Sequence, residues 1–231
     1  MNFETYLKEH GINQSSVERF GLKDLGNRLM IPIRDEAGFA IYNKYRNLDF
    51  DKDDPESRKF IFDPGHEAIL FNSQALTNYK KYVFLCEGEI DCIRLDQEGF
   101  LAVSGTAGAN TFKDRWVEKL SDKNVFILFD NDDAGKKAAQ EVGQKLVNAG
   151  TGVRIIQFPN GCKDVCDFFI QGRTKNELLL LIKESVGVIK IENDKLNQTD
   201  KSNQVSWPSP LSNEAFHGLA GEIVKLIEPH S

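Results

Sequence analysis

The segment Tyr82-Val-Phe-Leu-Cys-Glu-Gly-Glu-Ile-Asp91 decides the fold class, because an apolar run passes directly into glycine and acidic residues. An apolar run without alternation is typical of a strand that is covered on both faces. Similar runs recur at 101–104, 124–129 and 153–158, and segments with helical spacing lie between them. Strands that alternate with helices predict an α/β fold with a mostly parallel sheet and helices on both faces.

Carboxylates and glycine stand where these predicted strands end. The positions follow the first, third and fourth strands in turn: Glu87, Gly88 and Asp91, then Asp130 and Asp132, then Asp164 and Asp167. In open α/β sheets, ligands bind at the carboxyl ends of the strands. Carboxylates that converge there repel one another, and oxygen ligands suit Mg²⁺. The pattern therefore predicts a divalent-metal site of the kind that phosphoryl transfer needs.

A purely structural interpretation exists for each motif taken alone. Asp132 or Asp133 can cap the helix that follows. Glu89 and Asp91 can be solvated first-turn acids that the helix dipole favours. Three such motifs at strand ends of one sheet favour the metal site over three separate coincidences.

Four segments divide the chain. Residues 1–78 predict a smaller mixed α+β subdomain, with short helices before a hairpin of two strands. Residues 79–187 contain the alternating strands and helices. Residues 188–208 are polar and predict a linker, and residues 209–231 predict a C-terminal helix with an apolar stripe.

Composition excludes several classes of protein. The chain has 231 residues, of which 40% are hydrophobic and 28% charged, as in ordinary globular domains. Its longest apolar run, Leu178–Ile182, is far too short for a membrane helix, and the N-terminus does not resemble a signal peptide, so we expect a cytoplasmic protein without membrane contact. The four cysteines have no zinc-ligand spacing and are expected to be buried thiols. A net charge of −6 means that any nucleic-acid role needs local basic patches or bound metal.

The motifs, in this order, resemble the TOPRIM domain of topoisomerases, bacterial-type primases and some nucleases. The string FDNDDAGKKAA, residues 129–139, is similar to the primase branch. About residues 1–185 resemble the catalytic core of bacterial (DnaG-type) and of phage or plasmid primases. In that family the N-terminal subdomain supplies basic residues to the template and the incoming nucleotide. The matching positions are Arg28, Arg34, Lys44, Arg46 and Lys59.

The resemblance implies a role for each acidic position. Glu87 is the implied general base or metal ligand. The implied ligands of Mg²⁺ or Mn²⁺ are Asp130, Asp132 and Asp164, and Gly88, Asp91 and Asp167 are implied supporting residues. The implied reaction is primer synthesis in DNA replication, with single-stranded DNA and nucleotides as substrates.

Residues 207–231 resemble the leader segment before an ATPase-like domain in primase–helicase fusions. That likeness implies a replicative helicase, or a helicase domain, as partner, and a phage or mobile-element origin.

Two alternatives stay open. A TOPRIM nuclease uses the same metals to direct water at a phosphodiester. A non-catalytic nucleic-acid or helicase-binding remnant fits two departures from the primase pattern. The chain shows no zinc module, and residues 1–78 hold ten Lys and Arg against thirteen Asp and Glu.

Overall fold

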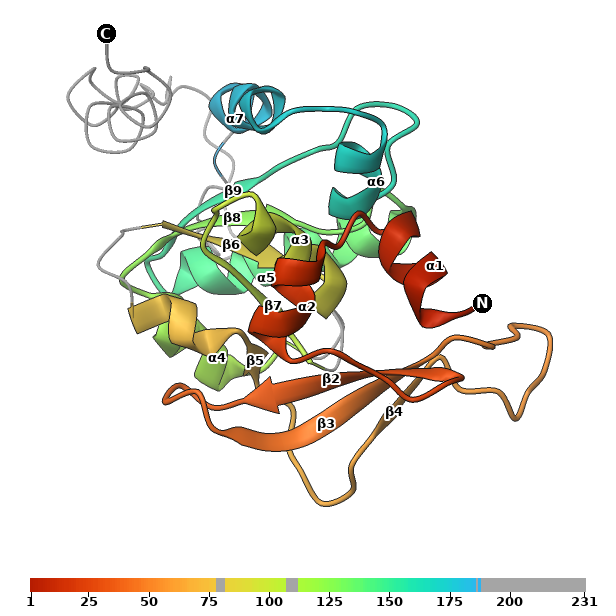
Figure 1. Ribbon diagram of the computed structural model, residues 1–231. Coiled ribbons are helices and arrows are strands. Elements are labelled where there is room, and N and C mark those ends of the chain that lie inside the picture. The colour runs from red at the N-terminus through yellow and green to blue at the C-terminus, as the bar shows by residue number, and fades with distance from the viewer. Residues whose placement is uncertain (78–81, 107–111, 186, 188–231) are drawn as a thin grey trace, which may run out of the picture. The chain divides into compact units, whose positions relative to one another are not determined.

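Two β-sheets organise the part of the chain that the computed structural model describes, residues 1–77, 82–106, 112–185 and 187. The first sheet has the strand order β1-β2-β3-β4, and the second has the order β5-β7-β6-β8-β9 (Figure 1). These residues fall within one compact unit, Met1–Ile191. The predicted C-terminal helix and leader segment lie outside the described residues.

The first sheet is antiparallel and follows two short helices, α1 (Phe3–Glu9) and α2 (Gln14–Phe20). Its strands are β1 (Lys23–Asp24), β2 (Arg28–Arg34), β3 (Ala40–Asn47) and β4 (Phe60–Phe62). Alternate residues of β2 are fully buried: Leu29, Ile31 and Ile33. Their partners on β3 are Arg46, Lys44 and Tyr42, so these polar side chains share the inner face of the sheet.

The second sheet confirms the predicted α/β class. Strands β6 (Tyr82–Cys86), β7 (Ala102–Gly105), β8 (Asn124–Leu128) and β9 (Gly152–Ile155) are parallel, and β5 (Leu70–Phe71) joins the edge in the antiparallel direction. A 3-10 turn, η1 (Ser73–Thr77), follows β5. The remaining helices are α3 (Glu89–Gln97), α4 (Asp114–Leu120), α5 (Asp133–Asn148), α6 (Val165–Ile170) and α7 (Lys175–Glu184).

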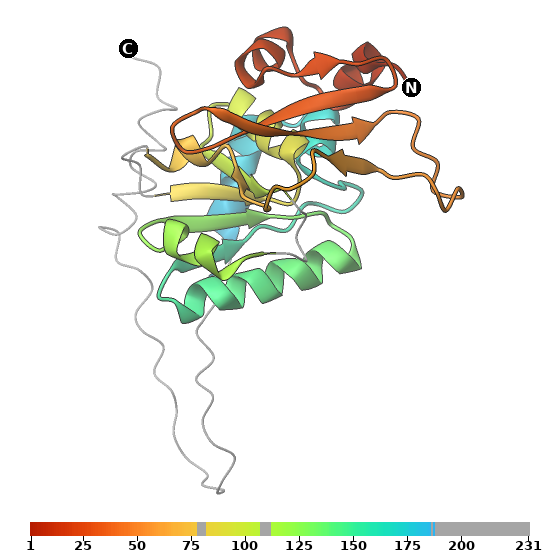
Figure 2. The same ribbon diagram turned by 90° about the horizontal axis from the view of Figure 1, so that it is seen from below.

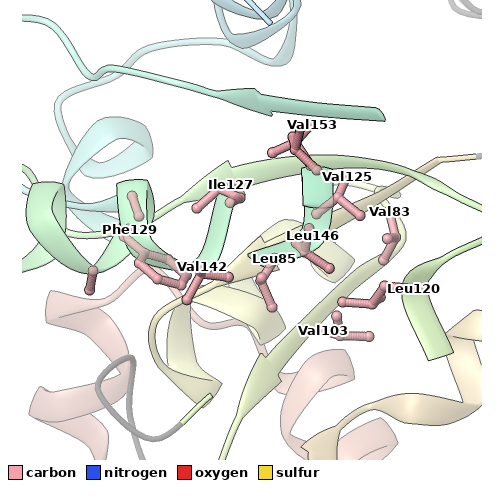
Figure 3. Close-up of a cluster of buried hydrophobic side chains, with 13 residues drawn as sticks. Val83, Leu85, Val103, Leu120, Val125, Ile127, Phe129, Val142, Leu146 and Val153 are labelled. Atoms are coloured by element: carbon pink, nitrogen blue, oxygen red, sulfur yellow. The ribbon is translucent and has the colours of Figure 1, made fainter. Parts of the chain in front are cut away.

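The two faces of this sheet carry different helices. Figure 2 shows α4 and α5 on one face, and α3 together with the first sheet on the other. The core beneath α5 is buried and mostly aliphatic (Figure 3). It includes Leu85, Ile127, Val142 and Leu146, together with Phe129. This packing holds the strands rigidly, so the residues that follow β6 and β8 are fixed relative to each other.

Two local features differ from the sequence expectation. Helix α6 was not predicted, because six residues are too few to establish a helical period; the Asp164 side chain starts it by accepting a hydrogen bond from the Asp167 N–H at 2.7 Å. Strand β5 precedes the predicted boundary at residue 78 but pairs with β7, so that boundary does not coincide with the division between the sheets. No described helix is long and apolar enough to cross a membrane.

Candidate active site

Glu87 and Asp130 meet at the carboxyl ends of two neighbouring strands. Strands β6 and β8 run in parallel with Cys86 opposite Leu128, so both chains leave the sheet at the same level. The Asp130 backbone N–H donates to Glu87 Oε2 at 3.3 Å. Burial raises the pKa of Glu87, and the Asp132 carboxylate adds to the rise.

Asp130 lies at the centre of the acidic group. Burial raises its pKa to about 7, and Glu87, Asp164 and Asp132 each add repulsion. Asp132 is exposed and caps α5, where its Oδ1 accepts from the Gly135 N–H at 2.7 Å. A Cβ on Gly135 would stand 2.2 Å from the Asp130 carbonyl oxygen, so only glycine allows this close turn.

Asp91 and Asp164 form the second half of the group, together with a thiol. The ligand atoms of Asp91, Asp164 and Cys166 all lie within 4.8 Å of one another. Asp91 Oδ1 accepts from the Cys166 N–H at 3.1 Å. Burial, followed by the Asp164 and Asp130 carboxylates, raises the pKa of Asp91. We call the five carboxylates Glu87, Asp91, Asp130, Asp132 and Asp164 the acidic cluster.

Cys166 was missed as a site residue. All four cysteines are buried and free, as expected, but Cys166 also contacts the acidic cluster. The available signal was its place between Asp164 and Asp167 in one short motif.

Backbone and side-chain contacts fix the loop that carries Asp164. The Asn131 N–H donates to the Lys163 carbonyl at 2.7 Å, and Asn131 Nδ2 donates to the Cys162 carbonyl at 2.9 Å. Asp167 Oδ2 accepts from the Lys163 N–H at 2.8 Å and from Gln171 Nε2 at 2.9 Å. Asp167 therefore stabilises the loop through contacts made from α6, and Asn131 connects the loop to the end of β8.

The donor set of the acidic cluster fits a divalent metal ion. Its members are carboxylates: burial, and after it their mutual repulsion, raises the pKa of Asp91 and Asp130, and a cation relieves that repulsion. Hard oxygen donors of this kind are the ligands that Mg²⁺ and Mn²⁺ prefer.

One of the five predicted basic residues, Lys59, lies within the electrostatic field of the acidic cluster, and Arg46 lies near Lys59. Burial and Arg46 lower the pKa of Lys59, while Asp130 and Glu87 act in the opposite direction, so the ammonium group lies within their field. The Arg46 guanidinium packs 5.3 Å from the Phe60 ring centre. Its Nε and Nη1 atoms are buried and have no hydrogen-bond partner among the described residues.

Lys44 has a different environment from the one expected of a phosphate contact. Only 4% of the residue is exposed, and its Nζ donates to both Glu89 carboxylate oxygens at 2.7 and 2.8 Å and to the Thr106 carbonyl at 2.9 Å. Glu89 is also 2% exposed rather than a solvated first-turn acid. The pair joins β3 to α3, so Lys44 has no free ammonium proton to offer a phosphate.

Arg28 and Arg34 are not brought to the acidic cluster. Arg28 is exposed at the start of β2 and pairs with Asn47, on the face opposite Arg46. Arg34 Nη1 donates to the Gly38 carbonyl at 3.1 Å in the hairpin turn.

Comparison with known proteins identifies relatives of this arrangement. A Toprim-like family model matches residues 84–169. A DNA primase of Chlamydia muridarum is 31% identical over 198 residues, which cover 78% of this chain and 32% of the relative. The gene 57 protein of Mycobacterium phage D29 is 38% identical over 119 residues, which cover 51% of this chain and 72% of that protein.

A solved structure of a primase is also similar to this chain. The Aquifex aeolicus primase, comprising zinc-binding and RNA polymerase domains, superposes with a TM-score of 0.67 at 27% identity, over 80% of this chain and 56% of that one. The chain spans about a third of the length of the curated Chlamydia muridarum primase.

Proposed function

Because the chain belongs to the Toprim-domain family that includes the DnaG-type primases, we propose that it is a primase catalytic core that synthesises short primers on single-stranded DNA. One observation carries this proposal. Carboxylates that follow three separate strands converge at one edge of the second sheet, and Lys59, just before β4, lies within the field of Asp130 and Glu87, with Arg46 near it. Carboxylates can hold a metal ion, and cations on the opposite side can hold phosphate. Such an arrangement suits the transfer of a nucleotidyl group.

A divalent ion, Mg²⁺ or Mn²⁺, is assigned to Asp130, Asp132 and Asp164, with Glu87 and Asp91 beside them. When bound, such an ion neutralises phosphate charge and lowers the pKa of an attacking hydroxyl. Side chains of the protein supply the phosphate contacts. In this proposal Arg46 and Lys59 bind the triphosphate of the incoming nucleotide from the side opposite the metal ion.

Glu87 is the proposed proton acceptor. Its raised pKa brings the carboxylate closer to the range in which a general base is effective. In the proposed reaction the 3′ hydroxyl of the primer attacks the α-phosphorus, its proton passes to Glu87, and pyrophosphate leaves. Gly88, which precedes α3 without a side chain, lets the substrate approach the start of that helix.

The proposed partners follow from the same reaction. The template is single-stranded DNA in the cytoplasm, and the resemblance of residues 207–231 to a primase–helicase leader supports a replicative helicase as partner. Lys44 is left out of the proposed substrate contacts because Glu89 and Thr106 occupy its ammonium group.

A primer-synthesis assay tests the proposal. We expect short products from single-stranded DNA, labelled nucleotides and Mg²⁺ or Mn²⁺, and none from the variant Asp130→Ala/Asp132→Ala. The matched control is Asp133→Ala, an exposed acid one residue further along, which should retain activity. Template degradation would instead indicate a nuclease. Metal binding without products or degradation would indicate a non-catalytic module.

A further inference from the structure

A groove beside the acidic cluster has no part in the function proposed above. It has a volume of about 470 Å³, and the side chains that matter here are Tyr42, Arg58, Phe60, Phe62, His66 and Thr106. We propose that this groove, the aromatic pocket, holds an unpaired base of the single-stranded template next to the reacting end. The inference rests on the proposed function, since it names a template contact for the same active site.

The register of the second sheet places the aromatic pocket beside the acidic cluster. Ser104 on β7 lies opposite Cys86 on β6, so Thr106 stands at the level of Gly88, one strand away from Glu87. The first sheet also extends from the acidic cluster to the aromatic pocket. Lys59 is within the field of Glu87 and Asp130, and Phe62 lies three residues further along, about 10 Å in extended chain.

The walls of the pocket offer flat aromatic surfaces. The His66 ring stacks on Tyr42 with centroids 5.0 Å apart and 14° between the planes. A hydrogen bond of 2.9 Å between Tyr42 Oη and Thr106 Oγ1 fixes the tyrosine ring of this stack. Phe62 also lines the pocket and is 42% exposed. Rings presented in this way stack on unpaired bases of any identity.

The charges around the pocket offer one phosphate contact. Arg58 is exposed at the rim and can contact a phosphate. The Asp63 carboxylate, which also lines the pocket, accepts from the Asn43 N–H and from Tyr45 Oη, both at 2.9 Å, and these bonds hold its pKa below the usual range. Asp63 therefore stays ionised, and Arg58 offsets its charge. Glu67 pairs with Arg115.

The exposure of the walls favours a base within a strand over a free nucleotide. Both His66 and Phe62 are open to solvent, so neighbouring nucleotides can continue past the bound base. A free nucleotide would have one base to stack and a single contact with Arg58, whereas a strand can add contacts from the nucleotides on either side of the bound base.

The test measures base stacking without catalysis. The probe is oligodeoxythymidylate carrying one 2-aminopurine, titrated with the full chain in EDTA. We expect quenching of the probe by the wild type, and a weakening of about 5- to 150-fold in Phe62→Ala and in His66→Ala, the range for loss of one stacked base. Phe62→Trp should restore binding. The control is Phe39→Ala, which removes a ring that is 72% exposed beside the same sheet but outside the pocket.

Several outcomes would overturn the inference. These are no quenching by the wild type, unchanged binding by both pocket variants, or an equal loss in Phe39→Ala. Competition by thymidine monophosphate as strong as by the oligonucleotide would make the pocket a nucleotide site instead. Because the binding test is run in EDTA and without nucleotides, it does not depend on catalysis, and failure of primer synthesis and failure of the pocket are separate results.

Discussion

At the scale of single residues, Asp130 couples the site to pH. Its pKa of about 7 lies well above the ordinary carboxyl value, so between those values the folded chain holds a proton that the unfolded chain has lost. Stability of the metal-free protein therefore falls as pH rises through this window, and the loss is complete above pH of about 7. A bound cation needs the ionised carboxylate and removes the repulsion.

We therefore expect Mn²⁺ to raise the melting temperature more at pH 8 than at pH 6. Thermal unfolding with and without the ion at both pH values measures this difference. Asp130→Asn should abolish most of it, because the amide neither titrates nor repels Glu87. Asp133→Ala serves as control and should behave like the wild type. An equal rise in melting temperature at both pH values would contradict the ionisation of Asp130 as the cause of the pH dependence.

The carboxylates of the site could be predicted from the sequence, but not all their neighbours could. Apolar runs reveal where strands end, so the sequence alone places Glu87, Asp130 and Asp164 at one edge of a sheet. The burial of Lys44 could not be predicted in this way, because its partner Glu89 is 45 residues away and belongs to a helix of the other sheet. Charge alone does not distinguish a phosphate contact from a buried ion pair.

At the scale of elements, the loop before α6 is positioned by contacts with the end of β8. The loop has no regular structure, yet Asn131 holds it at the end of β8 by hydrogen bonds to the Lys163, Cys162 and Phe158 carbonyls. Helix α5 was predicted at its observed bounds because sixteen residues establish a clear period, whereas α6 has only six. The position of Asp164 thus depends on contacts that periodicity does not reveal.

Asn131→Ala tests this arrangement. The variant keeps the backbone hydrogen bond but loses the side-chain bonds to the Cys162 and Phe158 carbonyls. We therefore expect Mn²⁺ affinity to fall by about 10-fold, as for other groups that orient metal ligands. Calorimetric titration measures the affinity. Gln144→Ala, which removes an exposed amide from α5, is the control and should bind normally. An unchanged affinity in Asn131→Ala would show that the backbone contacts suffice.

At the scale of the whole molecule, ion pairs connect the two sheets in two different environments. Lys44 and Glu89 are buried, and Lys44 Nζ also lies 4.2 Å from the Phe60 ring centre. Lys119 and Glu36 connect the hairpin of the first sheet to α4 at the surface, with the lysine side chain 42% exposed. Lys44 belongs to the strand that carries Arg46, which we propose to bind phosphate, and Glu89 begins the helix after β6. The buried pair therefore sets how the first sheet faces the edge of the second sheet where we propose that metal binds.

The two pairs give a matched comparison of stability. Lys44→Met leaves the Glu89 carboxylate buried without a partner, and we expect a loss of about 3–5 kcal/mol in the free energy of unfolding. Lys119→Met should cost less than about 1 kcal/mol, because water solvates the carboxylate that remains. Adding Glu89→Gln to Lys44→Met should recover part of the loss, since a neutral amide needs no counter-charge. Urea unfolding measures all three variants, and equal costs for Lys44→Met and Lys119→Met would show that the buried pair does not hold the sheets together.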